Sequence, residues 1–238
     1  MKEVIAMHGW SGDSHEWNLW SQLFQANGWH WKSCERGYGE LNPFNPIWPK
    51  QFSKDESQQR VFIGHSLGPH LIDKKVLSNA THVVLLASFG EFIPKGTTSR
   101  PLKTALKQME ARLGTKDEEE MLKTFLEKAC EPMPSSAVIP GPIQKGLSIE
   151  GRETLKADLQ LLIKTNGLPN GFPNKAKVLV VEDQQDAIVT SESKTSLLKE
   201  LRQHLRDEPT HWILNGTGHA LLEPRLIQRV HKWIMEKQ

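Results

Sequence analysis

Val61-Phe62-Ile63-Gly64-His65-Ser66-Leu67-Gly68-Pro69 is the stretch of sequence that decides the fold. It opens as an apolar run typical of a buried strand and ends in the pattern Gly-x-Ser-x-Gly. The residues that follow, with Leu71, Ile72 and Val76, are compatible with a helix. Strand, sharp turn and helix are the context that a nucleophile elbow requires, so we expect Ser66 to be a nucleophile rather than an ordinary turn residue.

The two glycines of this turn have a steric purpose. A turn this tight strains the backbone of the nucleophile, and side chains at positions 64 and 68 would collide with the neighbouring strand or helix. Ser66 should then point out from the carboxyl end of the sheet, where the N–H groups that begin the next helix face any negative charge formed at the serine. Pro69 suits the first helical turn, because its missing N–H costs nothing there.

A serine hydroxyl is a poor nucleophile at neutral pH and needs a base, and the base needs an acid to orient it. Parallel strands bring the loops at their carboxyl ends to one edge of the sheet. Asp186 and His219 each follow an expected strand by a few residues, and the chain order Ser, Asp, His is a known order for a serine triad. Asp183 is the rival acid, but it lies closer to its strand and could form the turn, so Asp186 is favoured.

Ten histidines compete for the role of base. His219 is favoured because Gly216 and Gly218 make its loop compact. We expect His8 to hold the first glycine turn by hydrogen bonds and His65 to point into the structure. The others occupy helix or strand positions, where a packed or surface histidine is the expectation: His15, His30, His70, His82, His204, His211 and His231.

The negative oxygen of a tetrahedral intermediate needs two N–H donors. One should be the backbone of Leu67, the first residue after the serine. The other should come from the turn after the first strand, where His8-Gly9-Trp10 offers the backbone of Trp10 and Gly9 lets that chain approach closely. The alternative for the Trp10 side chain is an ordinary core position, but it follows a turn, which favours a place in the pocket.

Short apolar runs alternate with helical patterns over most of the chain. Runs that are apolar on both faces are typical of a parallel sheet covered by helices on each side. We therefore expect an α/β fold with a mostly parallel sheet of about six strands covered by helices. The expected strands are residues 4–7, 29–33, 61–64, 82–88, 178–181 and 211–214.

This alternation stops between about residues 91 and 174, where no convincing strand appears. Apolar residues recur there at helical spacing in three segments. We expect a helical cap insertion over 91–174, above the carboxyl edge of the sheet, and a core built from 1–90 and 175–238. The apolar stripes are Leu102, Leu106, Met109 and Leu113; Met121, Leu122, Phe125, Leu126 and Ala129; and Leu155, Leu159, Leu162 and Ile163.

Composition argues against several classes of function. The 30 basic and 28 acidic residues leave a net charge of +2, which gives no case for nucleic acid as a partner. Cys34 and Cys130 make no disulfide framework, and no Cys/His spacing resembles a zinc site, so neither a metal nor a cofactor is expected. The first apolar run is too short for a signal peptide or a membrane span. We therefore expect a cytoplasmic protein with no membrane partner.

The whole chain resembles the α/β-hydrolase superfamily. The set His8-Gly9-Trp10, Gly64-His65-Ser66-Leu67-Gly68, Asp186 and Gly218-His219 is similar to its carboxylesterase branch. More narrowly, the His-Gly-Trp turn, the Ser-Leu-Gly elbow and Leu85-Leu86-Ala87-Ser88 resemble the pimeloyl-[acyl-carrier-protein] methyl ester esterases of biotin synthesis.

This resemblance implies roles for particular residues. Trp10 and Leu67 would line the oxyanion side of the pocket, and the helical cap would dock an acidic acyl-carrier protein. The chain departs from the family in three places. The run before the His-Gly turn is short, so the sheet should begin at the third usual strand; Pro69 replaces a small residue; and the stretch 41–54 is rich in Pro and Asn and should be irregular or a very short helix.

Three hypotheses about function follow from these residues. The first is a serine carboxylesterase that acts through an acyl-enzyme on a small or carrier-bound ester, with the pimeloyl-carrier methyl ester favoured. The second is a general small-ester hydrolase or thioesterase with the same triad. The third, from another class, is a ligand-binding protein with a vestigial triad. Dehalogenase and epoxide hydrolase are disfavoured, because both normally use an aspartate where Ser66 stands.

Local charge departs from the near-neutral whole between residues 95 and 116, where six basic residues accompany Glu110 alone. Arg100, Lys103 and Lys107 are spaced to share one side of a helix, away from its apolar stripe. A solvated helix face is the simplest interpretation. If this helix sits over the site, the same face would attract an acidic carrier protein, and salt would weaken that attraction.

Overall fold

The computed structural model describes residues 1–49, 58–96 and 99–236. Six strands form one sheet in the order β2-β1-β3-β4-β5-β6, and every neighbouring pair is parallel. The expected parallel sheet is therefore confirmed. The strands are β1 Lys2–Met7, β2 His30–Ser33, β3 Gln59–His65, β4 His82–Leu86, β5 Lys177–Asp183 and β6 Thr210–Leu214.

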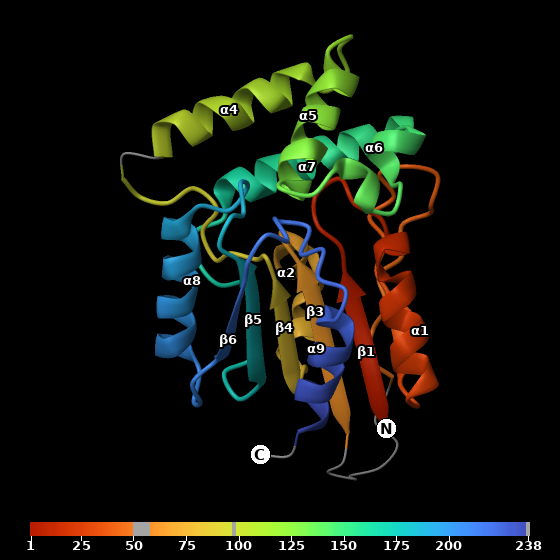
Figure 1. The fold of residues 1–238 in the computed structure, drawn as a ribbon, viewed down its shortest axis with the longest axis vertical. Coiled ribbons are helices and arrows are strands. Elements are labelled where there is room, and N and C mark those ends of the chain that lie inside the picture. The colour runs from red at the N-terminus through yellow and green to blue at the C-terminus, as the bar shows by residue number, and fades with distance from the viewer. Residues whose placement is uncertain (50–57, 97–98, 237–238) are drawn as a thin grey trace.

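Helices follow most of the strands and cover both faces of the sheet (Figure 1). Their bounds are η1 Ser14–Trp17, α1 Asn18–Ala26, α2 Gly68–Leu71, α3 Lys74–Ser78, α4 Ser99–Arg112, α5 Glu118–Cys130, η2 Ser135–Ala137, α6 Pro142–Lys145, α7 Ile149–Lys164, α8 Ser191–His204 and α9 Leu226–Met235.

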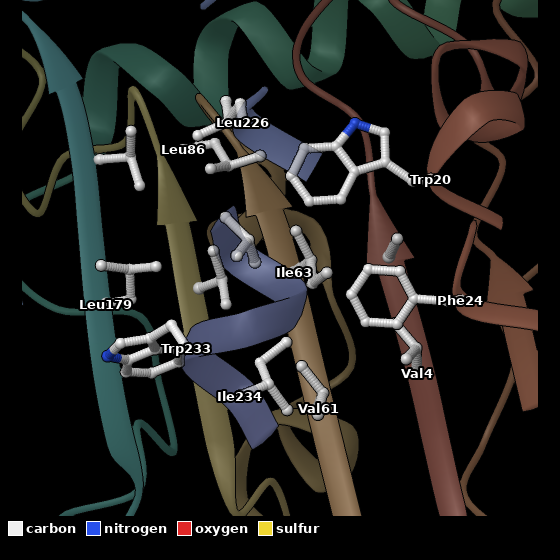
Figure 2. Packing of buried hydrophobic residues seen from close by; sticks show 14 of the residues in the cluster. Val4, Trp20, Phe24, Val61, Ile63, Leu86, Leu179, Leu226, Trp233 and Ile234 are labelled. Carbon is white, nitrogen blue, oxygen red and sulfur yellow. The ribbon is translucent and has the colours of Figure 1, made fainter. Parts of the chain in front are cut away.

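Side chains of successive strand residues point to opposite faces, and each face is buried against different helices. On one face, Val61 and Ile63 of β3 share a core with Phe24 of α1 and Trp233 of α9 (Figure 2). On the other face, Phe62 shares a core with apolar residues of α3 and α8. Burial on both faces explains why the strands read as continuous apolar runs rather than as alternating ones.

The helix expected after the elbow is in fact two short helices, α2 and α3. Ile72 adopts an extended conformation between them, and the Asp73 side chain accepts a hydrogen bond from the Lys75 N–H to begin α3. An apolar helical pattern does not reveal such a break, because Ile72 stays buried in either arrangement. Pro69 lies in the first turn of α2, as expected.

Two other segments refine the expectations. The last helix begins at Leu226, two residues after Pro224. In the stretch 41–54, residues 41–49 are irregular, with a single bridge between Glu35 and Phe44, and the remaining residues lie outside the described part of the chain.

Helices α4 to α7 lie together above the carboxyl edge of the sheet (Figure 1). The described residues of 91–174 contain no strand. The three apolar stripes contribute to one core, in which Leu106 of α4 and Met121 of α5 pack with Leu155 and Leu159 of α7. Trp10 and Leu67 belong to the same core and connect these helices to the sheet edge.

Helix α7 is held on the loop that follows β2. The Arg36 guanidinium donates two hydrogen bonds to Asp158 of α7, at 2.8 and 2.7 Å, and the Tyr38 hydroxyl donates a third at 2.6 Å. A Cβ at Gly151 would lie 2.0 Å from the Tyr38 carbonyl oxygen, so only glycine permits this approach of helix and loop. Asp158 is buried, and its pairing with Arg36 offsets the cost of removing a carboxylate from water.

None of the helices in the described part of the chain is both long and apolar enough to span a membrane.

Candidate active site

Ser66 lies directly after β3 with a φ of 53°, in the left-handed region. Such a conformation costs a non-glycine residue about 1–3 kcal/mol and persists only where the surroundings enforce it. A Cβ at Gly64 would lie 2.7 Å from Pro69, and one at Gly68 would lie 2.5 Å from the Met7 carbonyl oxygen. The expected steric purpose of both glycines is therefore confirmed: Gly64 meets α2 and Gly68 meets β1.

His219 lies in the loop after β6, and its Nε2 is 3.0 Å from Ser66 Oγ. Gly218, with a φ of 64°, brings this loop under the end of α5, where a Cβ would lie 2.3 Å from the Glu131 carbonyl oxygen. The Ala220 N–H also donates to the Ala129 carbonyl oxygen at 2.9 Å. The loop that carries His219 is thus fixed from above by the helices as well as from below by the sheet.

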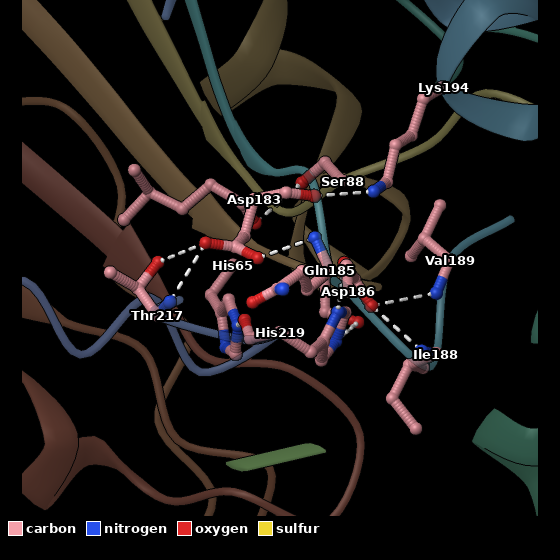
Figure 3. Close-up of polar contacts among 12 residues, drawn as sticks. His65, Ser88, Asp183, Gln185, Asp186, Ile188, Val189, Lys194, Thr217 and His219 are labelled. Atoms are coloured by element: carbon pink, nitrogen blue, oxygen red, sulfur yellow. Dashed lines mark hydrogen bonds and ion pairs between the residues drawn. The ribbon is translucent and has the colours of Figure 1, made fainter. Parts of the chain in front are cut away.

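Asp186 lies in the loop after β5, and its Oδ2 is 2.9 Å from His219 Nδ1. Its Oδ1 accepts the N–H groups of Ile188 and Val189 at 2.7 and 2.9 Å (Figure 3). Burial by itself would raise the pKa of Asp186, but His219 and these two N–H groups lower it overall. An ionised Asp186 places the proton of His219 on Nδ1 and leaves Nε2 able to accept the proton of Ser66.

Asp183, the rival acid, makes no hydrogen bond or ion pair with His219. Its Oδ2 accepts both the N–H and the hydroxyl of Thr217 at 2.8 Å, and its Oδ1 accepts the Gln185 N–H at 2.7 Å (Figure 3). Asp183 thus joins the loop that carries Asp186 to the loop that carries His219. The structure brings Asp186 to the histidine and gives Asp183 the turn-forming position.

His65 was expected to point into the structure, and this expectation is wrong in part. Its ring lines the cavity described below, and its Nε2–H donates to the carbonyl oxygen of His219 at 3.1 Å. Burial, together with the neighbouring His219, lowers the pKa of His65 to about 4, so this ring is neutral near pH 7. Sequence reasoning missed this support for the His219 loop, because nothing in the elbow motif shows which loop crosses above it.

Two further side chains hold the loops of the site. His8 Nδ1–H donates to the Gly9 carbonyl oxygen at 2.9 Å, and its Nε2 accepts the Arg36 N–H at 3.2 Å, as expected for a residue that holds the glycine turn. The buried ammonium of Lys194 donates to the carbonyl oxygen of Asp183. Lys194 follows an ordinary helical pattern in α8, so the sequence held no signal for it.

The turn after β1 lies against the serine. A Cβ at Gly9 would lie 3.0 Å from Ser66 Cβ, so this turn approaches as closely as the sequence suggested. Within the described residues, neither the Trp10 nor the Leu67 backbone N–H donates to a protein acceptor. The Trp10 ring lines the cavity and its Nε1–H donates to the Leu155 carbonyl oxygen at 2.8 Å. The Leu67 side chain, by contrast, is fully buried, and Leu67 is not among the described residues that line the cavity.

A cavity of about 490 Å³ opens beside Ser66 and His219. This volume is within the range of small-molecule sites. Its walls come from α1, from the end of α5 and the chain up to α6, and from the start of α9, and they are mainly apolar. The larger apolar lining residues are Trp10, Trp17, Leu19, Trp20, Leu86, Phe125, Leu126, Met133, Val138, Ile139, Ile143, Leu221, Leu222, Leu226 and Ile227.

Arg100, Lys103 and Lys107 are exposed on α4. Helix α4 packs through Leu106 on the core shared with α5 and α7, and it contributes none of the described residues that line the cavity. The expectation that this helix sits over the site is therefore met only in part: α4 lies above the sheet edge with α5 and α7 (Figure 1), but the cavity beside the serine is lined by α5 and the chain that follows it. An apolar stripe predicts that a helix packs on something, but it does not say on which element.

The described residues include no group of three or more histidine, cysteine or acidic side chains placed to hold a metal ion. The chemistry that the geometry supports is proton transfer from Ser66 to His219, with Asp186 stabilising the charged ring.

No family model and no curated protein matches this sequence. Solved structures do match it. An esterase from Exiguobacterium antarcticum is 14% identical, with 99% of this chain and 92% of that chain covered and a TM-score of 0.70. A bromoperoxidase from Bacillus anthracis is 15% identical over 99% of this chain and 92% of that chain, with a TM-score of 0.69. MenH from S. aureus is 15% identical over 98% and 90%, with a TM-score of 0.56. The α/β-hydrolase fold expected from the sequence is confirmed.

Proposed function

We propose that this protein is a serine hydrolase of carboxylic esters that acts through an acyl-enzyme. One observation carries the proposal: Ser66, His219 and Asp186 form a continuous hydrogen-bonded line, 3.0 and 2.9 Å between partners, at the wall of an apolar cavity. A serine held at a positive φ beside a base and an oriented acid is the arrangement that activates a hydroxyl for attack on a carbonyl carbon.

The proposed reaction has two halves. Ser66 Oγ attacks the ester carbonyl carbon while its proton passes to His219 Nε2. The carbon–oxygen bond to the alcohol then breaks, the alcohol leaves with the proton from His219, and the acyl group stays on Ser66. Water gives a proton to His219, attacks the acyl carbon and releases the carboxylic acid, and Ser66 regains its proton.

The negative oxygen formed in each half would accept hydrogen bonds from the backbone N–H groups of Trp10 and Leu67. Leu67 directly follows Ser66, Trp10 directly follows the Gly9 that approaches Ser66, and neither N–H donates to a protein acceptor within the described part of the protein. Donors that are already oriented in an apolar site stabilise such an oxygen without reorganising during the reaction.

Fold alone does not decide between an enzyme and a binding protein, since one fold carries many functions. A fluorophosphonate probe followed by mass spectrometry separates the two. We expect stoichiometric labelling of Ser66, with none in the Ser66→Ala variant. Absence of labelling in the wild-type protein would favour a ligand-binding protein with a vestigial triad.

Within this class we propose the methyl ester of a pimeloyl group on an acyl-carrier protein as the substrate. The proposal rests on the sequence resemblance at the His-Gly-Trp turn and the elbow, on the apolar cavity, and on the basic residues Arg100, Lys103 and Lys107, which an acidic carrier could contact. Because α4 does not line the cavity, the carrier would dock beside the opening and the acyl chain would have to reach across to Ser66.

A hydrolysis screen over carrier-bound methyl esters, free methyl esters, free aryl esters and thioesters tests this narrower proposal. We expect the highest kcat/KM for the carrier-bound methyl ester. A preference for free esters or for thioesters would favour a general ester hydrolase or a thioesterase and would contradict the proposal of a carrier-bound substrate.

A further inference from the structure

The charged side chains that line the cavity beside Ser66 are one-sided. Among the described residues that line it, none is a lysine or an arginine. The acidic residues Asp13, Glu16 and Glu223 do line it, and its histidines include His65, which is neutral near pH 7. A carboxylate that is buried in this cavity would lose water and, among the described lining residues, would find no lysine or arginine to pair with.

Glu16 shows that the cavity wall disfavours the charged form of a carboxyl group. Its Oε1 is buried and has no hydrogen-bond partner among the residues that the structure describes, and its Oε2 is 4.0 Å from Nδ1 of the neutral His65. Burial, with added repulsion from Asp13 and Glu35, raises the pKa of Glu16 to about 8, although His8 acts in the opposite direction. A wall that disfavours the charge of its own carboxyl will disfavour the charge of a substrate carboxyl too.

We infer that the cavity selects esters whose buried part is uncharged and discriminates against esters that carry a carboxylate on that part. The inference rests on the proposed ester hydrolysis and adds the substrate class. Burial of an unpaired ion is unfavourable, whereas the apolar lining favours hydrocarbon. Hydrolysis itself makes a carboxylate, so the same walls favour departure of the acid product.

Size-matched substrates test this directly. The 4-nitrophenyl esters of monomethyl adipate and of adipic acid differ only in a distal methyl ester or carboxylate. A second pair places the charge on the other side of the reacting bond: 4-(methoxycarbonyl)phenyl hexanoate and 4-carboxyphenyl hexanoate. We expect kcat/KM at pH 7 to be at least about 30-fold higher for the uncharged member in one or both pairs. Ratios within threefold in both pairs would overturn the inference.

A variant with a cation added to the cavity tests whether the missing positive charge causes the selectivity against charged esters. Leu19 of α1 lines the cavity, and its relative exposure of 60% leaves room for a longer side chain. We expect Leu19→Arg to raise the kcat/KM ratio of charged to uncharged ester by at least about fivefold over the Leu19→Gln control, because the guanidinium supplies the missing counter-charge. An unchanged ratio would show that charge in the cavity does not set the selectivity.

If the protein does not hydrolyse esters at all, the result would differ from a loss of selectivity. In that case no ester in either pair would be turned over. Calorimetric binding to the Ser66→Ala variant would then still test the inference, with dimethyl adipate expected to bind and the adipate dianion not. Equal binding of the two would overturn it.

Discussion

The loops at the carboxyl edge of the sheet and helix α4 above them both carry charged side chains, but they use them in opposite ways. At the sheet edge, Asp183 and Asp186 are each fixed by three hydrogen bonds, some from the loop after β5 and the others from the loop that carries His219. On α4, Arg100, Lys103 and Lys107 are exposed, and no ion pair within the described residues uses them.

This difference suggests that the buried aspartates serve the reaction and that the exposed cations of α4 serve the binding of a partner. A buried, fully bonded polar group holds reacting atoms in place, so a change of one atom should alter the rate of the reaction. An exposed, unpaired cation has little effect on stability and acts only on a partner that approaches it. Changes at the sheet edge should therefore lower kcat on every ester, and changes on α4 should matter for one kind of substrate only.

The largest effect is expected at Ser66 and His219. Replacement of either by alanine removes the nucleophile or its base, and we expect kcat to fall by about a million-fold on every ester while the fold is kept. Circular dichroism and a thermal melt check folding beside the kinetics. Activity within tenfold of the wild-type protein in either variant would contradict the assignment.

The two aspartates come next. Asp186→Asn should lower kcat by about 10⁴-fold, because an amide no longer favours the proton on His219 Nδ1 or stabilises the charged ring. Asp183→Asn should act on stability first: its NH₂ group would face an N–H of Thr217 or Gln185, at a cost of about 1–3 kcal/mol in the free energy of unfolding. If Asp183→Asn lowers kcat more than Asp186→Asn does, the roles must be exchanged.

The sequence was sufficient to predict the sheet and the three residues that meet at its edge. Both depend on short-range patterns, since an apolar run specifies a buried strand and a strand end places its loop at a known edge. The elbow glycines were predictable for the same reason, because their contacts with Pro69 and Met7 follow from the geometry of a strand–turn–helix unit.

Contacts between distant segments were not predictable. The hydrogen bond from His65 to His219, the ammonium of Lys194 on Asp183 and the Arg36–Asp158 pair join residues that no local pattern relates. For the same reason, the sequence did not show that α4 contributes none of the described residues that line the cavity. Its stripe showed that Leu106 is buried, but only the packing of α5 and α7 decides which helix covers the serine.

A smaller effect is expected from α4. Reversal of Arg100, Lys103 and Lys107 to glutamate should raise KM for the carrier-bound pimeloyl methyl ester by about tenfold and leave hydrolysis of a small free ester nearly unchanged. Reversal of the exposed Lys74 and Lys75 on α3 is the matched control and should do neither. Equal effects on both substrates, or none on the carrier-bound one, would remove the docking part of the proposal.

The smallest effect concerns Glu16 of η1, which lines the cavity. Its pKa of about 8 in the folded protein is above its ordinary value of 4.5. Between these two values the folded state holds a proton that the unfolded state has lost, so the contribution of Glu16 to stability falls as the pH rises from about 4.5 to about 8. Glutamine cannot ionise, and Glu16→Gln should therefore remove this loss.

We expect Glu16→Gln to leave the free energy of unfolding nearly unchanged at pH 4.5 and to raise it by about 1 kcal/mol at pH 8. The gain is modest because 31% of the Glu16 side chain is exposed and solvent screens part of the charge. Urea unfolding at several pH values measures it, with Glu127→Gln on the exposed face of α5 as the control that should show no such trend. A gain that is constant with pH would mean that the lack of a hydrogen-bond partner for Oε1, rather than ionisation of the carboxyl group, destabilises the protein here. The pKa of Glu16 would then say nothing about the cost of placing a charge in the cavity.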